Sequence, residues 1–241
     1  MPVLLEIAAF NLKSAIDAAQ AGADRIELCE NLPEGGVTPS YGSLKIALEK
    51  IAVPVFPIIR PRGGDFFYDS NEFAALLTDV KLCRELGFGG IVTGVLKRNG
   101  QIDRDRMSAI AEAAGDMQLT CHRAFDRALD PFEALENLIT LGFHRVLTSG
   151  QQNEATEGVG LIRELNKTAG GRILIIPGSG VTSANIKFLA EETQVKEIHS
   201  SARKMAPSQM DFIHPVTGSL STVSIDAEDI KKMKQELTSL R

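Results

Sequence analysis

The chain has 241 residues, of which 44% are hydrophobic and 24% are charged, a composition typical of a globular protein and not of a disordered or fibrous one. Asp and Glu number 31 against 26 Lys and Arg, and the net charge of −5 argues against a protein that mainly binds nucleic acid or an anionic membrane. The cysteines Cys29, Cys83 and Cys121 have no metal-binding spacing, and the N-terminus lacks the basic residues of a secretion signal. We therefore expect a cytoplasmic protein with free thiols.

Short apolar segments rich in β-branched residues alternate with segments of helical periodicity along the chain. The predicted strands cover residues 4–8, 25–29, 55–60, 90–93, 119–122, 145–148, 173–177 and 197–200. The predicted helices cover residues 14–21, 40–51, 70–87, 104–115, 131–141, 155–168, 182–192 and 226–239. These alternations predict an α/β fold in which a parallel sheet closes into a single (β/α)8 TIM barrel, one domain over residues 1–241. Residues 203–225 form the longest connection and are a candidate lid or interface.

Polar residues at the ends of the predicted strands are the candidates for function, because in such barrels the loops that follow the strands form the functional face. The candidate catalytic residues are Glu6, Glu27, His122, Asp126 and His199. A histidine at a strand end with a carboxylate nearby suits general acid–base catalysis, and His122 with Asp126 fits this description. The alternative for this pair is a capped loop without a catalytic role. His199 offers similar chemistry, with Ser201 and Arg203 beside it.

The two glutamates of the first two strands are predicted to face the barrel interior. Side chains alternate along a strand, so if Glu27 points inward, Arg25 and Cys29 do so too. A carboxylate on the helix side would be an unpaired buried charge, which is very costly. Two neighbouring carboxylates raise one pKa unless a cation intervenes, and Arg60 is the expected neighbour. The alternative is a buried ionic layer of Glu6, Glu27 and Arg25 or Arg60 that only fills the barrel.

Two stretches have the composition of anion-binding sites. The candidate anion-binding residues are Arg60, Arg62, Gly178, Ser179, Gly180, Ser201 and Arg203. Small residues at 178–180, ahead of a predicted helix, let main-chain N–H groups approach an anion, and in a closed barrel Ser201 and Arg203 would lie across from this turn. Arg60 and Arg62 offer bidentate donors for a carboxylate or phosphate. The alternatives are a glycine turn without a ligand and loop salt bridges to nearby aspartates.

Several of these segments together resemble the CutC family of copper homeostasis proteins. The segments that carry the resemblance are GADRIELC (22–29), EGGVTPS (34–40), IIRPRGGDF (58–66), CHRAFD (121–126), RVLTSG (145–150) and HSSAR (199–203). The resemblance spans nearly the whole predicted barrel. It implies a cytoplasmic (β/α)8 barrel protein that forms homodimers or larger homo-oligomers and has a role in copper tolerance, with Cu(I) bound by cysteines.

For this chain the resemblance places the copper ligand at Cys29. The family often has a second cysteine two residues after the first-strand glutamate, where this chain has Ala8. Because Cu(I) prefers at least two soft ligands, a single thiol opposite an alanine predicts weak Cu(I) binding. The polar residues match the family pattern, which favours a second hypothesis. In this hypothesis the protein is an enzyme that acts on a small anionic or phosphorylated substrate by proton transfer or isomerisation, with Glu27 and His122 as acid–base groups.

Overall fold

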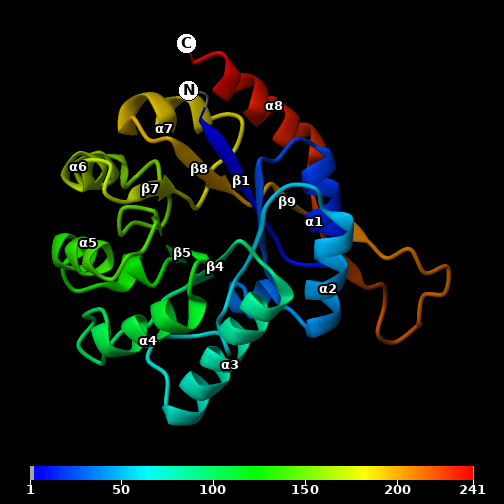
Figure 1. The fold of residues 1–241 in the computed structure, drawn as a ribbon. Coiled ribbons are helices and arrows are strands. Elements are labelled where there is room, and N and C mark those ends of the chain that lie inside the picture. Colours follow the sequence, from blue (N-terminus) through cyan, green and yellow to red (C-terminus); the bar gives the residue numbers. More distant parts are fainter. Residues whose placement is uncertain (1–2, 241) are drawn as a thin grey trace.

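The computed structural model describes residues 3–240 and shows the predicted (β/α)8 barrel (Figure 1). The strands of the barrel are β1 Leu4–Ala9, β2 Arg25–Leu28, β3 Val55–Pro57, β4 Gly90–Thr93, β5 Gln118–Cys121, β6 Arg145–Thr148, β7 Leu174–Pro177 and β8 Glu197–Ser200. The helices are α1 Leu12–Gln20, α2 Tyr41–Lys50, α3 Ser70–Leu86, α4 Arg104–Ala114, α5 Pro131–Thr140, α6 Val159–Ala169, α7 Ile186–Thr193 and α8 Ala227–Thr238. Two 3-10 helices, η1 Leu32–Glu34 and η2 Phe125–Arg127, follow β2 and β5.

Hydrogen bonds join the strands into two parallel halves, in the orders β3-β2-β1-β8 and β4-β5-β6-β7. The halves meet just beyond β3, where Ile58 pairs with Val92 of β4 and the Ile59 N–H donates to the Val92 carbonyl at 2.7 Å. On the other side β7 lies beside β8, and the Ser200 hydroxyl donates to the carbonyl of Val181, which follows β7. The C-terminal ends of all these strands therefore meet at one end of the barrel.

Capping side chains start the helices where the sequence supplies Asn or Asp. The Asn11 side chain accepts the Ser14 N–H at the start of α1. Asp69 and Glu72 form a reciprocal capping box at the start of α3. Such caps satisfy main-chain donors that have no acceptor inside the helix, so they fix where each helix begins relative to the loop before it.

The hydrophobic core has two parts. The larger part lies between strands and helices and includes Cys121 of β5 and Cys83 of α3. The smaller part lies inside the barrel and consists of Cys29, Phe56, Ile58 and Val92. The predicted alternation is confirmed, because Cys29 faces the interior and Cys121 packs in the outer core.

The seventh helix begins later than the sequence predicts. Its first residue is Ile186 instead of residue 182, because the Thr182 N–H donates to the Asn185 side chain at 2.9 Å and residues 182–185 form a turn. The turn at 178–180 therefore does not lie at the N-terminus of a helix, which removes the helix dipole from the predicted anion site.

The connection at 203–225 contains two strands. It forms an antiparallel hairpin of β9 Arg203–Pro207 and β10 Ser221–Ile225, whose strands pair with each other. Asn11 donates to the Val223 carbonyl at 2.9 Å and ties β10 to the start of α1. The rest of the hairpin projects from the barrel as the orange arm in Figure 1.

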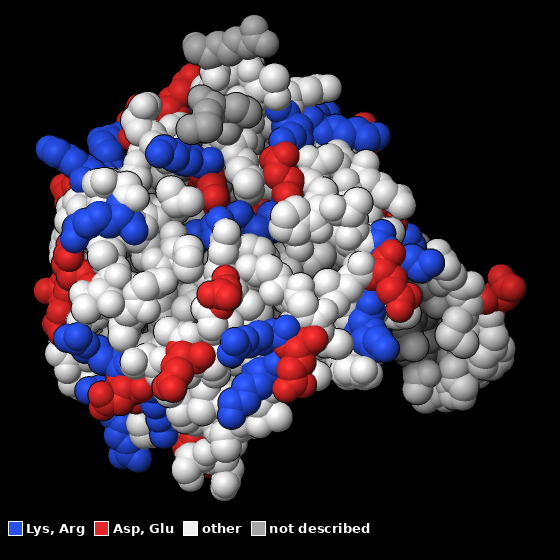
Figure 2. Space-filling model, in the orientation of Figure 1, with Lys and Arg blue, Asp and Glu red and all other residues white. Residues whose placement is uncertain are grey.

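The surface carries charges of both signs. Figure 2 shows that basic and acidic side chains are interspersed over the face in view. Within residues 3–240, no helix has both the length and the apolar character needed to cross a membrane.

Candidate active site

A cavity of about 910 Å³ opens among the loops at the C-terminal ends of the strands. The predicted site residues that line it are Glu27, Cys29, Arg60, His122, Ser179, Gly180, His199, Ser201 and Arg203. Ala8, Phe66 and Arg123 also line it. The other predicted residues, Glu6, Arg62, Asp126 and Gly178, are described by the structure but lie outside this lining.

A chain of buried ion pairs fills the barrel next to this cavity. Arg25 pairs with Glu6 of β1, and its Nη2 lies 2.5 Å from Glu197 at the start of β8. Arg145, at the start of β6, donates to the same Glu197 oxygen at 2.9 Å. Phe56 packs against both guanidinium groups, at 5.1 and 5.5 Å from its ring centroid. An ionic layer is thus present with Glu6 and Arg25, but Glu27 forms no ion pair with Arg25 among the described residues. Sequence reasoning missed Glu197 and Arg145, whose only signal was a charge at the start of a buried strand.

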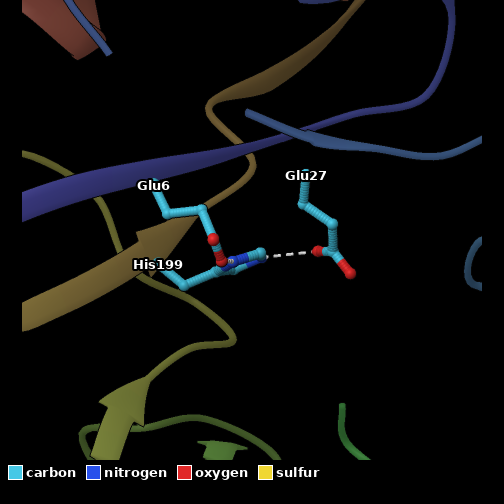
Figure 3. Close-up of side chains that lie close together, drawn as sticks. All are labelled: Glu6, Glu27 and His199. Atoms are coloured by element: carbon cyan, nitrogen blue, oxygen red, sulfur yellow. Dashed lines mark hydrogen bonds and ion pairs between the residues drawn. The ribbon is translucent and has the colours of Figure 1, made fainter. Parts of the chain in front are cut away.

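His199 connects this ionic layer to the cavity (Figure 3). Its Nδ1 lies 2.7 Å from Glu6 Oε1, and its Nε2 lies 3.5 Å from Glu27 Oε2. Burial by itself raises the pKa of Glu6, but Arg25 and His199 outweigh it and lower that pKa to about 2. Burial by itself lowers the pKa of His199. The hydrogen bond to Glu6 and the charge of Glu27 outweigh this effect, so the pKa of His199 lies above its usual value. Glu6 is therefore a permanent carboxylate that holds His199 in place.

Of the two neighbouring glutamates, Glu27 is the one whose side chain lines the cavity. Its side chain is 5% exposed, and in the described part of the chain its nearest charged partner is His199, at 3.5 Å. Burial raises the pKa of Glu27 to about 7, and the charge of Glu6 adds to the rise against the opposing charges of His199 and Arg25. The expected cation, Arg60, donates to main-chain carbonyl groups and forms no ion pair with either glutamate among the described residues. Glu27 is thus the carboxyl group with the raised pKa, and it can take up and release a proton near neutral pH.

His122 follows β5 and is a neutral hydrogen-bond donor. Its Nδ1 accepts the Ala124 N–H at 3.2 Å, which places the ring proton on Nε2. Nε2 is buried and has no hydrogen-bond partner in the part of the chain that the structure describes. Burial, and then the charge of Arg60, lower the pKa of His122 to about 3. Gly94 packs on the ring so closely that a Cβ there would lie 2.8 Å from Nδ1, which keeps the imidazole in one position.

The expected pair of His122 and Asp126 is contradicted by the structure. The loop after β6 folds onto Asp126, whose carboxylate accepts the Ser149 N–H at 3.0 Å and the Thr148 hydroxyl. It also accepts the Arg123 Nε–H at 2.7 Å. Asp126 is therefore occupied by main-chain and hydroxyl donors and has a positioning role in this loop.

Arg60 and Arg62 have different surroundings although only one residue separates them. Arg60 is 5% exposed and donates to three main-chain carbonyl groups at 2.7–3.0 Å. Arg62 lies outside the cavity lining and pairs with Glu72 at 2.5 Å and with Asp65 at 3.1 Å. The predicted clamp of two arginines is therefore wrong, since Arg62 forms the loop salt bridges of the alternative interpretation.

Arg123 and the turn after β7 form the outer rim of the cavity. Sequence reasoning missed Arg123, whose signal was its place directly after His122. Its Nη1 donates to Ser179 Oγ at 3.2 Å. Gly178 is needed for close packing instead of for anion contact, because a Cβ there would lie 2.5 Å from Leu147 and 3.2 Å from His199.

Three side chains have the spacing of a possible cation site. Glu6, Glu27 and His199 can each place one donor atom within 4.8 Å of the others. Arg25 and His199 already place positive charge beside the two carboxyl groups, since the raised pKa of His199 favours its protonated form. The cluster therefore fits a hydrogen-bonded acid–base group better than a bound cation.

Sequence comparison places the chain among known proteins. The sequence pattern of the CutC family matches residues 3–204. The chain belongs to the CutC family. The CutC protein of Klebsiella pneumoniae is 48% identical over 229 residues, which cover 95% of this chain and 91% of that protein. The CutC protein of Parabacteroides distasonis is 46% identical over 242 residues, which cover 96% of this chain and 99% of that protein.

Solved structures agree with the barrel fold. The CutC protein of Streptococcus agalactiae, which is named for copper homeostasis, matches with a TM-score of 0.78 and 36% identity over 83% of this chain and 98% of that chain. A phosphoribosylanthranilate isomerase from Thermotoga maritima matches with a TM-score of 0.59 and 10% identity over 99% of this chain and 100% of that chain. At this identity the second likeness shows the fold alone.

The residues of this CutC-family chain do not fit a Cu(I) site. Burial, and then the charges of Glu27 and Glu6, raise the pKa of Cys29 well above 9, so its sulfur stays a neutral thiol. Ala8 lines the cavity, and among the described lining residues no second sulfur is present. Cu(I) prefers at least two soft donors, and the cavity offers one.

Proposed function

We propose that this protein is an enzyme that catalyses proton transfer on a small anionic substrate, with Glu27 as the base. The observation that carries the proposal is the position of Glu27, whose carboxyl group lines the cavity while the neighbouring Glu6 is held by Arg25 and His199. A general base works best when its pKa lies near the operating pH, and burial raises that of Glu27 to about 7.

The chemistry follows from the two groups that face the cavity. A carbon next to a carbonyl group gives its proton to Glu27, the electron pair of the broken C–H bond forms a C=C bond, and the carbonyl oxygen becomes an oxyanion. His122 donates its Nε2–H to that oxygen and keeps its own proton, because its neutral form is the stable one. Return of the proton from Glu27 to the same carbon restores the carbonyl group and completes an exchange. Where that carbon also carries a hydroxyl group, transfer of the hydroxyl proton to the oxyanion and of the Glu27 proton to the former carbonyl carbon would complete an isomerisation.

The charges at the cavity support an anionic substrate. Arg60 lies in the wall, and Arg123 lies at the rim with the turn at Ser179. Both can attract an anionic group of the substrate. Binding of Cu(I), which the name of the Streptococcus agalactiae relative suggests, would depend on Cys29 alone, and we rank it second for this reason.

Solvent deuterium exchange tests the proposal without knowledge of the full reaction. Small 2-oxo acids and sugar phosphates are incubated in D2O with the wild type, with Glu27→Gln and with Glu228→Gln, and NMR follows the loss of C–H signals. Glu228 is a matched control because it lies at the rim of the same cavity and is 73% exposed. We expect exchange for at least one compound, slowed about 10²–10⁴-fold by Glu27→Gln and unchanged by Glu228→Gln. Exchange that survives in Glu27→Gln, or its absence for every compound, would contradict the proposal.

A further inference from the structure

Arg60 carries a buried positive charge that no acidic side chain among the described residues neutralises. Its guanidinium group is 5% exposed and donates to main-chain carbonyl groups, which are neutral. Among residues 3–240, no Asp or Glu oxygen lies within the 4.0 Å of an ion pair with Arg60. The neighbouring Tyr68 is fully buried, and burial raises the pKa of its hydroxyl, so it adds no negative charge. A buried charge without a counter-charge is costly, and a ligand anion would remove this cost.

His122 provides an unused donor on the same wall of the cavity. It is 3% exposed, and its Nε2 has no acceptor among the described residues. His122 and Arg60 both contact the ring of Phe66. The Phe66 ring centroid lies 4.9 Å from the His122 ring centroid and 4.9 Å from Arg60 Cζ. The aromatic face attracts the guanidinium group but offers no lone pair to either N–H donor. One positive charge and one neutral donor therefore lie together under a single ring.

We propose that the substrate is a 2-oxo carboxylate, with its carboxylate at Arg60 and its carbonyl oxygen at the Nε2–H of His122. The assignment rests on the proposed function in one respect, namely that the carbon next to the carbonyl gives its proton to Glu27. The Phe66 ring, which contacts both groups, lines the same cavity.

The charge balance favours a carboxylate over a phosphate at this place. Arg60 supplies one positive charge, and His122 is neutral. A ligand with one negative charge therefore neutralises this part of the cavity wall. A phosphate group carries about 1.5 to 2 negative charges at neutral pH and would leave part of its charge unpaired in a buried site that already contains Glu27. A planar carboxylate also matches the planar guanidinium group. In a 2-oxo acid the carbonyl oxygen is adjacent to the carboxylate, so one small molecule can meet both groups.

Side-chain NMR of the wild type tests the assignment directly. The protein is labelled with 15N at arginine and histidine, and sodium pyruvate, sodium acetate or inorganic phosphate is added at equal ionic strength. We expect pyruvate at millimolar concentration to move the side-chain N–H signals of both Arg60 and His122, acetate to move those of Arg60 alone, and phosphate to move neither. Phosphate shifts larger than those of pyruvate, equal effects of acetate on both residues, or no response to pyruvate would overturn the assignment.

Two arginine variants provide a matched comparison. Arg60→Lys keeps the charge but loses the planar donor group, and we expect it to weaken pyruvate binding about tenfold or more. Arg62→Lys alters a residue outside the cavity and should leave binding unchanged. If the wild type binds pyruvate at Arg60 and His122 but exchanges none of its C–H protons, the result would count against Glu27 as the base and leave the ligand assignment standing. Retained exchange without any response at Arg60 and His122 would overturn the ligand assignment alone.

Discussion

Replacing Glu27 with Gln is expected to stabilise the protein at alkaline pH. Folding raises the pKa of this buried carboxyl group from 4.5 to about 7. Between these two pH values the folded chain holds a proton that the unfolded chain has lost, so the free energy of unfolding falls as the pH rises through this interval. One pH unit corresponds to about 1.4 kcal/mol, and the loss reaches about 3 kcal/mol above pH 7. Gln has the shape of the protonated side chain and does not titrate, so the variant avoids the loss.

Thermal unfolding followed by circular dichroism between pH 4.5 and 9 measures this difference. For a chain of this size 1 kcal/mol corresponds to about 2–4 °C, so the Tm of Glu27→Gln should exceed that of the wild type by about 6–12 °C at pH 8. The two Tm values should converge near pH 4.5, where the wild-type carboxyl group is protonated in the folded state. A Tm of Glu27→Gln below that of the wild type at pH 8 would refute the reasoning.

Glu6→Gln is the matched control and should have the opposite effect. The pKa of Glu6 is lowered from 4.5 to about 2, so its charge contributes stability that is fully present above pH 4.5 and is lost as the pH falls through 2. Removing the charge leaves Arg25 and His199 without this partner and should cost about 3 kcal/mol at neutral pH.

Other variants test the surroundings of the site. Gly94→Ala would place a methyl carbon 2.8 Å from His122 Nδ1, so it should displace the ring and abolish the response of its Nε2–H signal to pyruvate, and an unchanged response would contradict this packing. Asp126→Asn removes the charge that holds Arg123 and the loop after β6, and chemical denaturation should show a loss of about 1–3 kcal/mol; an unchanged midpoint would argue against this role. Competition with a Cu(I) chelator should show weak binding that Cys29→Ser hardly alters, whereas tight binding of one Cu(I) that this variant abolishes would contradict the fit argument.

The barrel and the inward direction of the two glutamates could be predicted because both depend on local pattern. Strand alternation places Glu27 and Cys29 on one face, and the cost of an unpaired buried charge decides that this face is the interior. Which of the two carboxyl groups has the low pKa and which has the raised pKa could not be predicted. It depends on Arg25 and His199, which come from β2 and β8 and reach Glu6 only when these strands lie on either side of β1.

Contacts between loops were the part that sequence reasoning could not reach. Asp126 follows His122 closely in the chain, but the loop after β6 supplies better donors and takes the carboxylate. Arg60 and Arg62 look equivalent in the sequence, and only the path of the loop decides that Arg62 meets Glu72 instead of the cavity. The start of α7 depended in the same way on a turn that ends at Asn185.

The most direct test of the central claim is a 13C NMR titration of the Glu27 carboxyl carbon. Glutamate labelled at Cδ gives one signal for each residue, and the signal of Glu27 is the one that disappears in Glu27→Gln. The account predicts a midpoint near pH 7, set by burial and by Glu6 against the opposing charges of His199 and Arg25. A midpoint at or below the ordinary value of 4.5 would contradict it, because Glu27 would then be a permanent carboxylate like Glu6 and not a group that exchanges protons at neutral pH.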